Sequence, residues 1–372
     1  MKVVVFAHVP PPHHGQSQMV KLMVDGFRKD PSLGIEVLHV DARLSSDMAD
    51  VGSARGGKLR PLLRYCLQAW KLSRKHRCRT LYYIPAPPRR TPLYRDFIVL
   101  GLLRLRFRRI VFHWHSVGLG TWLETEARPW ERWLAHWLLG GAEVSIVLAA
   151  SNRGDAEKLH PHRLRVVNNG IPDPCPDYHT EIAPHRRQLP ERDVVRVLYL
   201  AHCTREKGLF DAVEAVVEAN RRSKGVRFVM RVAGSFLSAE EEAEFRERIG
   251  RPDASGCVKH VGFAAGADKD RLFRESDLFL FPTYFANEGQ PLNLIEAMAY
   301  GLPSVTTRWR AIPEYFPKDY PGLCNAKEVA GIATALGRMA GAGGSETLRE
   351  AFEQRYALKP HLKNLSIALR MP

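Results

Sequence analysis

Short runs of β-branched and aromatic residues alternate with longer amphipathic segments along most of the chain, and this alternation restricts the possible fold more than any other feature. In the first half it predicts strands at residues 2–8, 35–40, 80–84, 109–114, 144–149 and 164–168, with helices between them, for example at 17–29 and 128–139. Near-continuous apolar strands separated by helices are typical of a parallel sheet that is covered on both faces.

The alternation stops between Ile171 and Asp193, where prolines are frequent and no hydrophobic period is present. It restarts with strands predicted at 194–200, 226–233, 257–261, 277–281 and 303–306 and helices predicted at 207–221, 238–249, 268–276 and 291–300. The length of 372 residues also exceeds what one core usually holds. We therefore expect two doubly wound α/β domains, residues 1–172 and 194–349, joined by a linker at 173–193.

The segment E-G-Q-P-L-N-L-I-E, residues 288–296, follows the strand predicted at 277–281. Pro291 stands where a first helical residue is favoured, and Gly301 suits the position just after the end of a helix. A helix N-terminus after a strand presents unpaired N–H groups and the positive end of a dipole, which is what a diphosphate needs. We expect the amides of Leu292 and Asn293 to be donors there, and Gly289 to allow close approach of the backbone.

With the following E-A-M-A-x-G-x-P, this segment resembles the two-glutamate motif of the retaining glycosyltransferase family 4. The resemblance implies a GT-B fold, in which two Rossmann-like domains face each other across a cleft and a C-terminal helix, here about 350–372, crosses back to the first domain. Pro360 is expected to kink or interrupt that helix. The family implies that Glu296 binds the donor ribose, that Glu288 borders the sugar, and that Gly289 and Gln290 line the donor site.

Residues 200–208, L-A-H-C-T-R-E-K-G, look like the family's G-R-x-x-x-x-K-G loop, whose arginine and lysine neutralise the leaving diphosphate. Such charge stabilisation is the main requirement of this chemistry. Lys207 matches the lysine, but His202 occupies the arginine position, and the nearest arginine is Arg205. Two alternatives stay open: Arg205 reaches the phosphates from another direction, or His202 takes the role.

Two segments of the first domain also suit a site. Strand alternation places His113 and His115 on the same side at the end of the strand 109–114, and the family implies that His115 lies near the reaction centre. The turn P-P-P-H-H-G-Q-S at 10–17 matches the family's glycine-rich loop only at Gly15, and a plain strand-to-helix turn capped by Ser17 explains it nearly as well.

No metal or other cofactor is expected. Asp268-Lys269-Asp270 has D-x-D spacing but opens a helix, so we interpret it as a helix cap, and no third ligand stands near the two histidines. Basic side chains and a helix dipole take the place of a metal in the GT-B enzymes. The six cysteines are scattered and predict reduced thiols in a cytosolic protein.

A formal net charge of +15 predicts an anionic partner. Arginines 104, 106, 108 and 109 interleave with apolar residues, which suits an anionic membrane surface contacted through 89–109. Trp130, Trp133 and Trp137 share one helical face and are either part of that surface or part of the core. No run is long enough to cross a bilayer. We expect a cytoplasmic protein, peripheral on the inner face of the membrane.

Taken together, these patterns predict a retaining glycosyltransferase. It would move a hexose from a nucleoside diphosphate sugar to an acceptor hydroxyl, on a lipid-linked saccharide in cell-surface polysaccharide synthesis, without a nucleic-acid partner. Two alternatives remain. One is a GT-B-fold epimerase that hydrolyses a UDP-sugar, and the other is a non-catalytic basic protein that binds membranes or nucleic acid. Stabilisation by UDP or GDP would separate the enzymes from the last.

Overall fold

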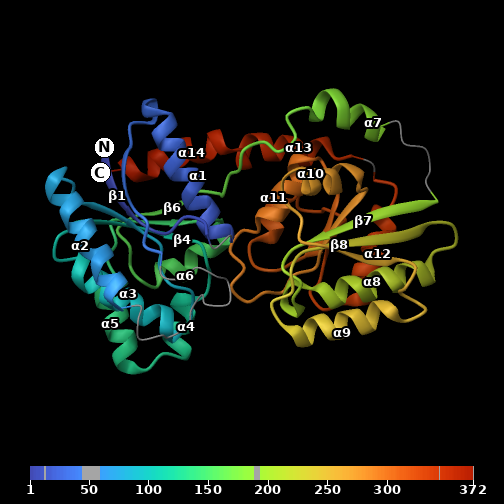
Figure 1. Cartoon of the computed structure of the whole chain (residues 1–372), viewed down its shortest axis with the longest axis horizontal. Coiled ribbons are helices and arrows are strands. Elements are labelled where there is room, and N and C mark those ends of the chain that lie inside the picture. Colours follow the sequence, from blue (N-terminus) through green and yellow to red (C-terminus); the bar gives the residue numbers. More distant parts are fainter. Residues whose placement is uncertain (12–13, 44–58, 188–192, 343, 372) are drawn as a thin grey trace. The chain divides into compact units, whose positions relative to one another are not determined.

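Two six-stranded sheets carry the fold in the computed structural model, which describes residues 1–11, 14–43, 59–187, 193–342 and 344–371 (Figure 1). Every pairing between neighbouring strands is parallel. The chain divides into two units. Unit 1 comprises residues 1–170, 287–290 and 358–372, and unit 2 comprises residues 171–286 and 291–357.

The sheet of unit 1 has the order β2-β1-β3-β4-β5-β6. Its strands are β1 (Lys2–Phe6), β2 (Glu36–Val40), β3 (Thr80–Tyr83), β4 (Arg109–Trp114), β5 (Val144–Val147) and β6 (Leu164–Val166). The six strands that the alternation predicts are therefore confirmed. Its helices are α1 (Gly15–Lys29), α2 (Leu59–Lys75), α3 (Arg90–Leu103), α4 (Leu119–Thr125), α5 (Pro129–Leu139), α6 (Arg153–Glu157) and α14 (Leu358–Arg370).

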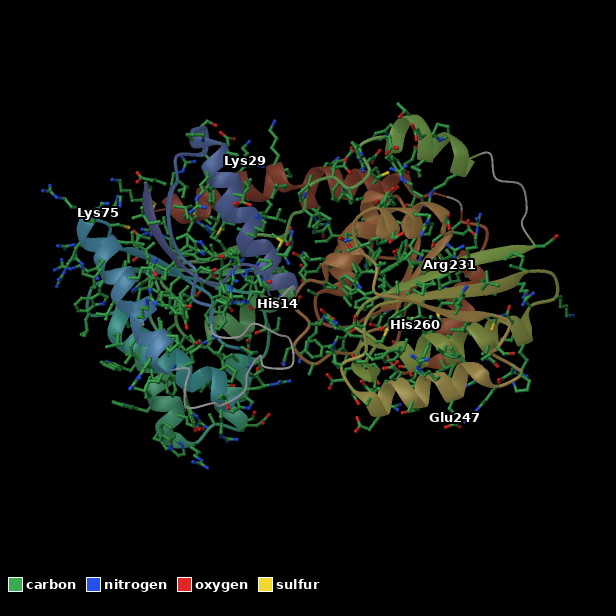
Figure 2. The ribbon with its side chains drawn as sticks, in the orientation of Figure 1. His14, Lys29, Lys75, Arg231, Glu247 and His260 are labelled. Atoms are coloured by element: carbon green, nitrogen blue, oxygen red, sulfur yellow. The ribbon has the colours of Figure 1, made fainter. Side chains whose placement is uncertain are left out.

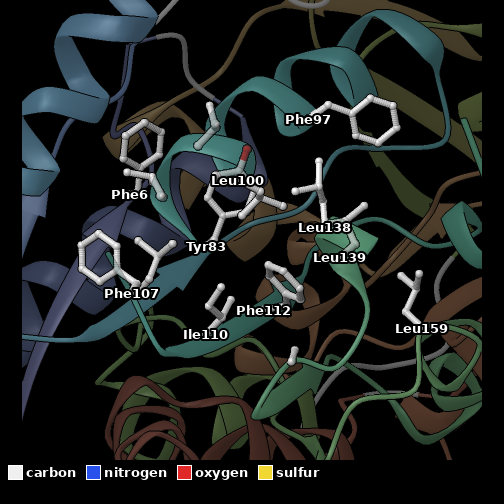
Figure 3. Close-up of a cluster of buried hydrophobic side chains, with 14 of the residues drawn as sticks. Phe6, Tyr83, Phe97, Leu100, Phe107, Ile110, Phe112, Leu138, Leu139 and Leu159 are labelled. Atoms are coloured by element: carbon white, nitrogen blue, oxygen red, sulfur yellow. The ribbon is translucent and has the colours of Figure 1, made fainter. Parts of the chain in front are cut away.

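Alternate residues of each strand enter opposite layers, because successive side chains of a strand point to opposite faces. Val4 and Phe6 pack in the layer of α2, α3 and α5, whereas Val3 and Val5 pack in the layer of α1 and α14. Figure 3 shows the first of these cores, in which Phe6, Tyr83, Leu100, Ile110, Phe112 and Leu138 gather. Both faces of the sheet are thus covered by helices, as expected for a parallel sheet.

The sheet of unit 2 has the order β12-β11-β10-β7-β8-β9. Its strands are β7 (Val194–Leu200), β8 (Arg227–Ala233), β9 (Val258–Gly262), β10 (Leu278–Phe281), β11 (Ser304–Thr307) and β12 (Leu323–Cys324). Its helices are α7 (Ala183–Arg187), α8 (Leu209–Arg222), α9 (Ala239–Gly250), α10 (Gly266–Glu275), α11 (Leu292–Ala299), α12 (Val329–Met339) and α13 (Glu346–Ala351). Here β7 and β10 are neighbours, and the strand order runs in opposite directions on either side of them. Such switch points are where doubly wound sheets bind ligands.

The segment predicted as a linker, residues 173–193, contains more structure than expected. Residues Tyr178–Ile182 form a π-helical turn that leads into α7, and the Tyr178 side chain is fully buried against Gly301. Arg349 donates to the carboxylate of Asp173 and anchors the start of the segment. Prolines interrupted the hydrophobic period but did not prevent packing. Residues 188–192 lie outside the described part of the chain.

The terminal helix is present and packs on unit 1, as expected, but Pro360 does not break it. Helix α14 begins at Leu358, so Pro360 falls in its first turn, where a backbone N–H has no partner within the helix. The interruption lies earlier, at Ala357, after the π-helical turn Phe352–Tyr356. Within unit 1, Leu362 of α14 packs directly on Gly26 of α1.

Candidate functional site

The two sequence motifs of unit 2 leave the sheet at neighbouring strands. The loop at 201–208 follows β7 and the loop that starts at Pro282 follows β10, so they lie on either side of the switch point. The amide of Tyr284 donates to the carbonyl of Glu206 at 2.9 Å. Gly208, with φ +78°, faces the carbonyl of Pro282 so closely that a Cβ would overlap it. The tertiary structure therefore joins two motifs that are about 80 residues apart.

Lys207 ends a short 3-10 turn, Arg205–Lys207, and its ammonium lies over two aromatic rings. The Nζ atom is 4.6 Å from the ring centroid of Phe285 and 5.8 Å from that of Phe281. His202 lies close enough that burial, and then the charge of Lys207, lower its pKa. His202 is therefore neutral near pH 7, so it can offer a hydrogen bond to a phosphate but no full charge.

Arg205 is directed to helix α9. Its guanidinium bonds the carboxylate of Glu244 at 2.5 Å, stacks over the ring of Phe210, and has its pKa raised mainly by Glu244. Its main-chain amide donates to Glu241 at 2.8 Å. Of the two alternatives left open by the sequence, this arrangement favours His202 as the residue beside Lys207.

Helix α11 begins at Leu292, with Pro291 as its N-cap, one residue later than predicted. The side chain of Asn293 donates to the carbonyl of Leu200 at 2.8 Å and accepts from the amide of Leu294 at 2.9 Å. This contact fixes the first turn of α11 against the end of β7. The helix ends before Gly301, whose φ of +55° agrees with the position predicted for it.

Glu296 stands on α11 with a carboxylate that accepts from Lys269 Nζ at 2.5 Å; the side chains are 17% and 31% exposed. No sequence pattern predicted this partner, which comes from α10. The interpretation of residues 268–270 as a cap is wrong, because α10 already begins at Gly266. Asp268 pairs with Arg271 instead, and Asp270 with Arg274 and Tyr300.

Residues 288–290 of the segment belong to unit 1. A Cβ on Gly289 would overlap the carbonyl oxygen of His115, so the glycine is needed for this main-chain contact. The Gln290 side-chain oxygen accepts from the amide of Asn169 at 2.5 Å, and the Asn169 amide group donates to the Gln290 carbonyl at 3.2 Å. Gln290 thus clamps the loop to the turn at 168–170. Glu288 beside them is only 6% exposed.

Histidines converge around the end of β4. His113 and His115 have ring centroids 4.3 Å apart, and Tyr82 of β3 is hydrogen-bonded to His113 Nδ1 at 2.6 Å. Burial, followed by the neighbouring His361 and His14, lowers the pKa of His115 to about 3. His361 of α14 is hydrogen-bonded through Nδ1 to the carbonyl of Asn168, and burial lowers its pKa to about 4. These rings are therefore neutral near pH 7.

The turn before α1 lies at the switch point of unit 1, between β1 and β3. Helix α1 begins at Gly15, and its N-cap residue is His14 (Figure 2). Ser17, at the third helical position, completes a capping box, because its hydroxyl oxygen accepts from the His14 amide at 3.2 Å. His14 Nε2 is 2.9 Å from Nε2 of His8. Pro12 and His13 of the same predicted loop lie outside the described residues.

The predicted site residues thus form two groups. Gly15, His115, Glu288, Gly289 and Gln290 belong to unit 1, and His202, Arg205, Lys207, Leu292, Asn293 and Glu296 belong to unit 2. Among the described residues, no three His, Cys, Asp or Glu side chains converge as metal ligands. None of the described helices has the length and apolarity to cross a bilayer.

Comparison with known proteins gives a domain match and a fold match. Residues 194–341 match the family described as "Glycosyl transferases group 1". The chain is 32% identical over 167 residues to the amylovoran biosynthesis glycosyltransferase AmsK of Erwinia amylovora, which covers 42% of this chain and 40% of that protein. It is 30% identical over 132 residues to the putative colanic acid biosynthesis glycosyltransferase WcaL of Escherichia coli K12, covering 34% and 31%. The matches thus span less than half the length of these relatives.

The solved structures agree on the fold. HepE of Anabaena, crystallised with UDP and glucose, superposes with a TM-score of 0.68 at 16% identity and 99% coverage of both chains. The lipopolysaccharide outer core galactosyltransferase WaaB gives 0.69 at 15% identity, covering 99% of each chain. Identities this low establish the architecture alone. The chain therefore has the GT-B fold, and its residues 194–341 match the glycosyltransferase group 1 family.

Proposed function

We propose that this protein is a retaining glycosyltransferase that moves a hexose from a nucleoside diphosphate sugar to an acceptor hydroxyl. The observation that carries the proposal is the meeting of the Lys207 loop and the first turn of α11 at the β7–β10 switch point. A lysine and a helix N-terminus both stabilise the negative charge of a departing diphosphate. The group 1 domain match and the UDP and glucose bound by Anabaena HepE support this reading.

In unit 2, the amides of Leu292 and Asn293 and the side chains of Lys207 and His202 would hold the diphosphate. Glu296 would accept the ribose hydroxyls. In the present structure its carboxylate accepts a hydrogen bond from Lys269, which a bound ribose would share or displace. Arg205, held by Glu244, would support the loop rather than touch the donor.

In unit 1, His115 and Glu288 would border the transferred sugar, and Gly15 would line the same region. Since His115 is neutral at pH 7, it would bind a sugar hydroxyl or the acceptor through a hydrogen bond rather than through charge. Gly289 and Gln290 would keep Glu288 in place by fixing its loop to His115 and Asn169.

We propose further that the acceptor is a lipid-linked saccharide used in cell-surface polysaccharide synthesis at the cytoplasmic face of a membrane. The names of the amylovoran and colanic acid relatives support a polysaccharide product. A membrane-bound acceptor would also give a role to the positive charge of +15 and to the basic segment 89–109.

Nucleotide binding is the first test. UDP, GDP and ADP would be added separately and the melting temperature measured, because a ligand that binds only the folded state raises it. One of the three should raise it at concentrations well above its Kd. If none does, the transferase proposal fails. With the matching sugar nucleotide and a saccharide acceptor, the anomeric configuration of the product by NMR would then test retention.

Side-chain roles are tested on the same assay. Lys207→Ala should lower kcat by roughly 100-fold, since it removes one stabiliser of the developing charge. Glu296→Ala should mainly weaken the binding of the nucleotide. Glu247→Ala is the control for the second change, because Glu247 lies on α9 with a side chain that is 72% exposed (Figure 2). Equal effects at Glu296 and Glu247 would contradict the proposed role of Glu296.

We propose that the reaction needs no bound metal, since Lys207 and the dipole of α11 supply the positive charge. Activity measured after treatment with EDTA, with and without added Mg²⁺, should therefore be unchanged. A loss on chelation that Mg²⁺ restores would contradict this part of the proposal.

A further inference from the structure

Helix α5 exposes a stripe of three tryptophans. Trp130, Trp133 and Trp137 are 48%, 69% and 64% exposed, and the rings of Trp133 and Trp137 are stacked 6.4 Å apart at 8°. The alternative that these residues form core is therefore wrong. Large aromatic side chains gathered on a surface mark an interaction site, whereas scattered single ones need no explanation.

Helix α2 of the same layer also exposes apolar residues. Leu59, Leu63 and Leu67 follow one another at intervals of four, so they share one side of the helix, and Leu67 is 62% exposed. The helix carries no acidic residue, while its basic residues are Arg60, Arg64, Lys71, Arg74 and Lys75. Helix α2 therefore combines an exposed apolar row with charged residues that are all basic. Figure 2 shows Lys75 at the end of α2, projecting away from the unit.

Helix α3 connects the two. Trp130 stacks on Tyr94 of α3 at 5.6 Å and meets Phe97 at 6.5 Å, while the indole N–H of Trp70 on α2 donates to the carbonyl of Leu102. Between these contacts Ile98 is 40% exposed. Helices α2, α3 and α5 thus form one layer over the sheet of unit 1 (Figure 1), and we call its outer surface the α2–α3–α5 face.

The turn after α3 belongs to this face, but most of its arginines serve the fold. Arg104 donates to the carbonyls of Leu138 and Gly140 at the end of α5, and Arg106 donates to Ser73 of α2. Leu105 between them is 76% exposed. The arginines at 104 and 106 therefore join the three helices and present Leu105 outward, so they are poor choices for testing a charge contact.

We propose that the α2–α3–α5 face lies flat on an anionic lipid bilayer, with Trp133, Trp137 and Leu105 at the level of the headgroups. Tryptophan favours that level, and helices with an apolar row and a basic flank lie in the plane of the interface. Because α2 carries basic residues and no acidic ones, its positive charge is complementary to anionic lipid headgroups. This inference rests on the proposed function, because it names the surface on which a lipid-linked acceptor would be met.

This orientation suits the acceptor. Each of the helices α2, α3 and α5 leads back to the start of the next strand, so their first turns lie toward the edge of the sheet at which the strands end. His115 follows the end of β4 at this same edge. From Trp130 to Trp137 the stripe extends roughly 10 Å along α5. A bilayer under this face would hold the headgroup of a lipid-linked saccharide near the same edge.

Sedimentation with vesicles tests the inference on the full-length protein. Binding to phosphatidylcholine vesicles that contain about one third phosphatidylglycerol should exceed binding to vesicles of pure phosphatidylcholine. This binding should weaken in high salt. Trp133→Ser with Trp137→Ser should reduce binding by roughly tenfold or more. Quenching of tryptophan fluorescence by brominated lipid should fall in the same variant. Unchanged binding and quenching, or no binding by the natural protein, would overturn the proposal.

Controls lie on the opposite layer of unit 1. Ile367→Ser on α14 replaces an apolar side chain that is 43% exposed and should leave binding unchanged. For charge, Lys71→Glu with Lys75→Glu should weaken binding to anionic vesicles, whereas Lys359→Glu with Lys363→Glu on α14 should not. Equal losses of vesicle binding in the two double variants would indicate that net charge alone attracts the protein. That result would contradict binding through the α2–α3–α5 face.

Two further measurements separate this inference from its alternatives. If the tryptophans instead join two copies of the chain, light scattering will detect a dimer that the double serine variant abolishes, and the proposal fails. The nucleotide-dependent rise in melting temperature should be the same in the natural protein and in the tryptophan variant. If neither protein shows that rise, the proposed transferase is rejected. The vesicle measurements would still test the membrane proposal independently.

Discussion

At Gly289 the site loop passes so close to the main chain of His115 that no side chain fits between them. Next to it, Gln290 exchanges two hydrogen bonds with Asn169. The two residues that follow Glu288 in the motif thus act through geometry, by fixing the position of the glutamate. In the sequence they were expected to line the donor site, and their observed partners are protein groups.

Replacing Gly289 by alanine should therefore move the loop. We expect Gly289→Ala to lower the free energy of unfolding by about 1–3 kcal/mol, because the added methyl must displace packed backbone, and to reduce transferase activity. Denaturant unfolding and a rate assay would measure the two effects. Gly154→Ala is the matched control, since a Cβ at Gly154 meets no atom within 4 Å. If both alanines behave alike, the contact with His115 is not what requires the glycine.

At the scale of elements, α14 completes the core of unit 1 although it comes from the other end of the sequence. Its residues Leu362, Leu365 and Leu369 pack with Val3, Val5 and Phe27 on the layer of α1. Leu365 is fully buried and Ile367, two residues later, is 43% exposed. The helix therefore separates a packed side from a solvent side within one turn.

Alanine substitutions on these two sides should differ clearly. Leu365→Ala should cost about 2–5 kcal/mol of stability, because it leaves a cavity in a close-packed core. Ile367→Ala should change stability by about 0.5 kcal/mol or less. Chemical denaturation of both variants measures the difference. Similar small effects would mean that α14 is not an integral part of unit 1 in solution.

Arg349 performs a comparable role within unit 2. Its side chain is 3% exposed and donates to Asp173, Glu353 and the carbonyl of Ala299, so it ties α13 to the start of the 173–193 segment. Arg349→Leu should destabilise the protein by about 3 kcal/mol, since its partners lose a buried cation. Arg246→Leu, which removes an exposed pair with Glu242, should cost less than about 1 kcal/mol. Equal losses would contradict the anchoring role.

At the scale of the whole molecule, unit 1 gathers histidines from segments that are distant in the sequence. His8 and His14 follow β1, His113 and His115 come from the end of β4, and His361 comes from α14. Burial is the first cause of the lowered pKa values of His8, His113, His115 and His361. A buried imidazole resists protonation, so the folded protein binds fewer protons than the unfolded chain at mildly acidic pH.

Stability should consequently fall on acidification. The pKa of each buried histidine in the folded protein is lower than the value of about 6.5 in the unfolded chain. Stability is therefore unaffected above about pH 6.5 and begins to fall as the pH drops below it. The fall continues until the folded values, about 3 for His115 and about 4 for His361, are reached. By pH 5 each of these two should cost about 2 kcal/mol.

Urea unfolding between pH 5 and 8 measures this slope. His361→Asn should flatten it, because asparagine can still donate to the carbonyl of Asn168 but does not titrate. His162→Asn, at an exposed position, is the control. A slope that is the same in all three proteins would contradict a contribution from His361.

The strands and the order of the elements could be predicted, because buried parallel strands are short apolar runs that local pattern identifies. The elements that were not foreseen depend on distant contacts. Residues 178–187 form helical turns because Tyr178 finds a pocket beside Gly301, and β12, with only two residues, exists because it pairs with β11. Pro360 is tolerated because the helix starts two residues earlier than the proline.

The sequence by itself determined which features follow the strands of the site: a lysine after β7, a helix start after β10 and histidines after β4. Spacing alone sufficed for these because a turn and a helix N-terminus are local structures. Which side chains those residues meet was decided only by the tertiary structure. It paired Glu296 with Lys269, Arg205 with Glu244 and His113 with Tyr82, and it turned the tryptophans of α5 outward, because burial and pairing depend on neighbours that the chain brings together only on folding.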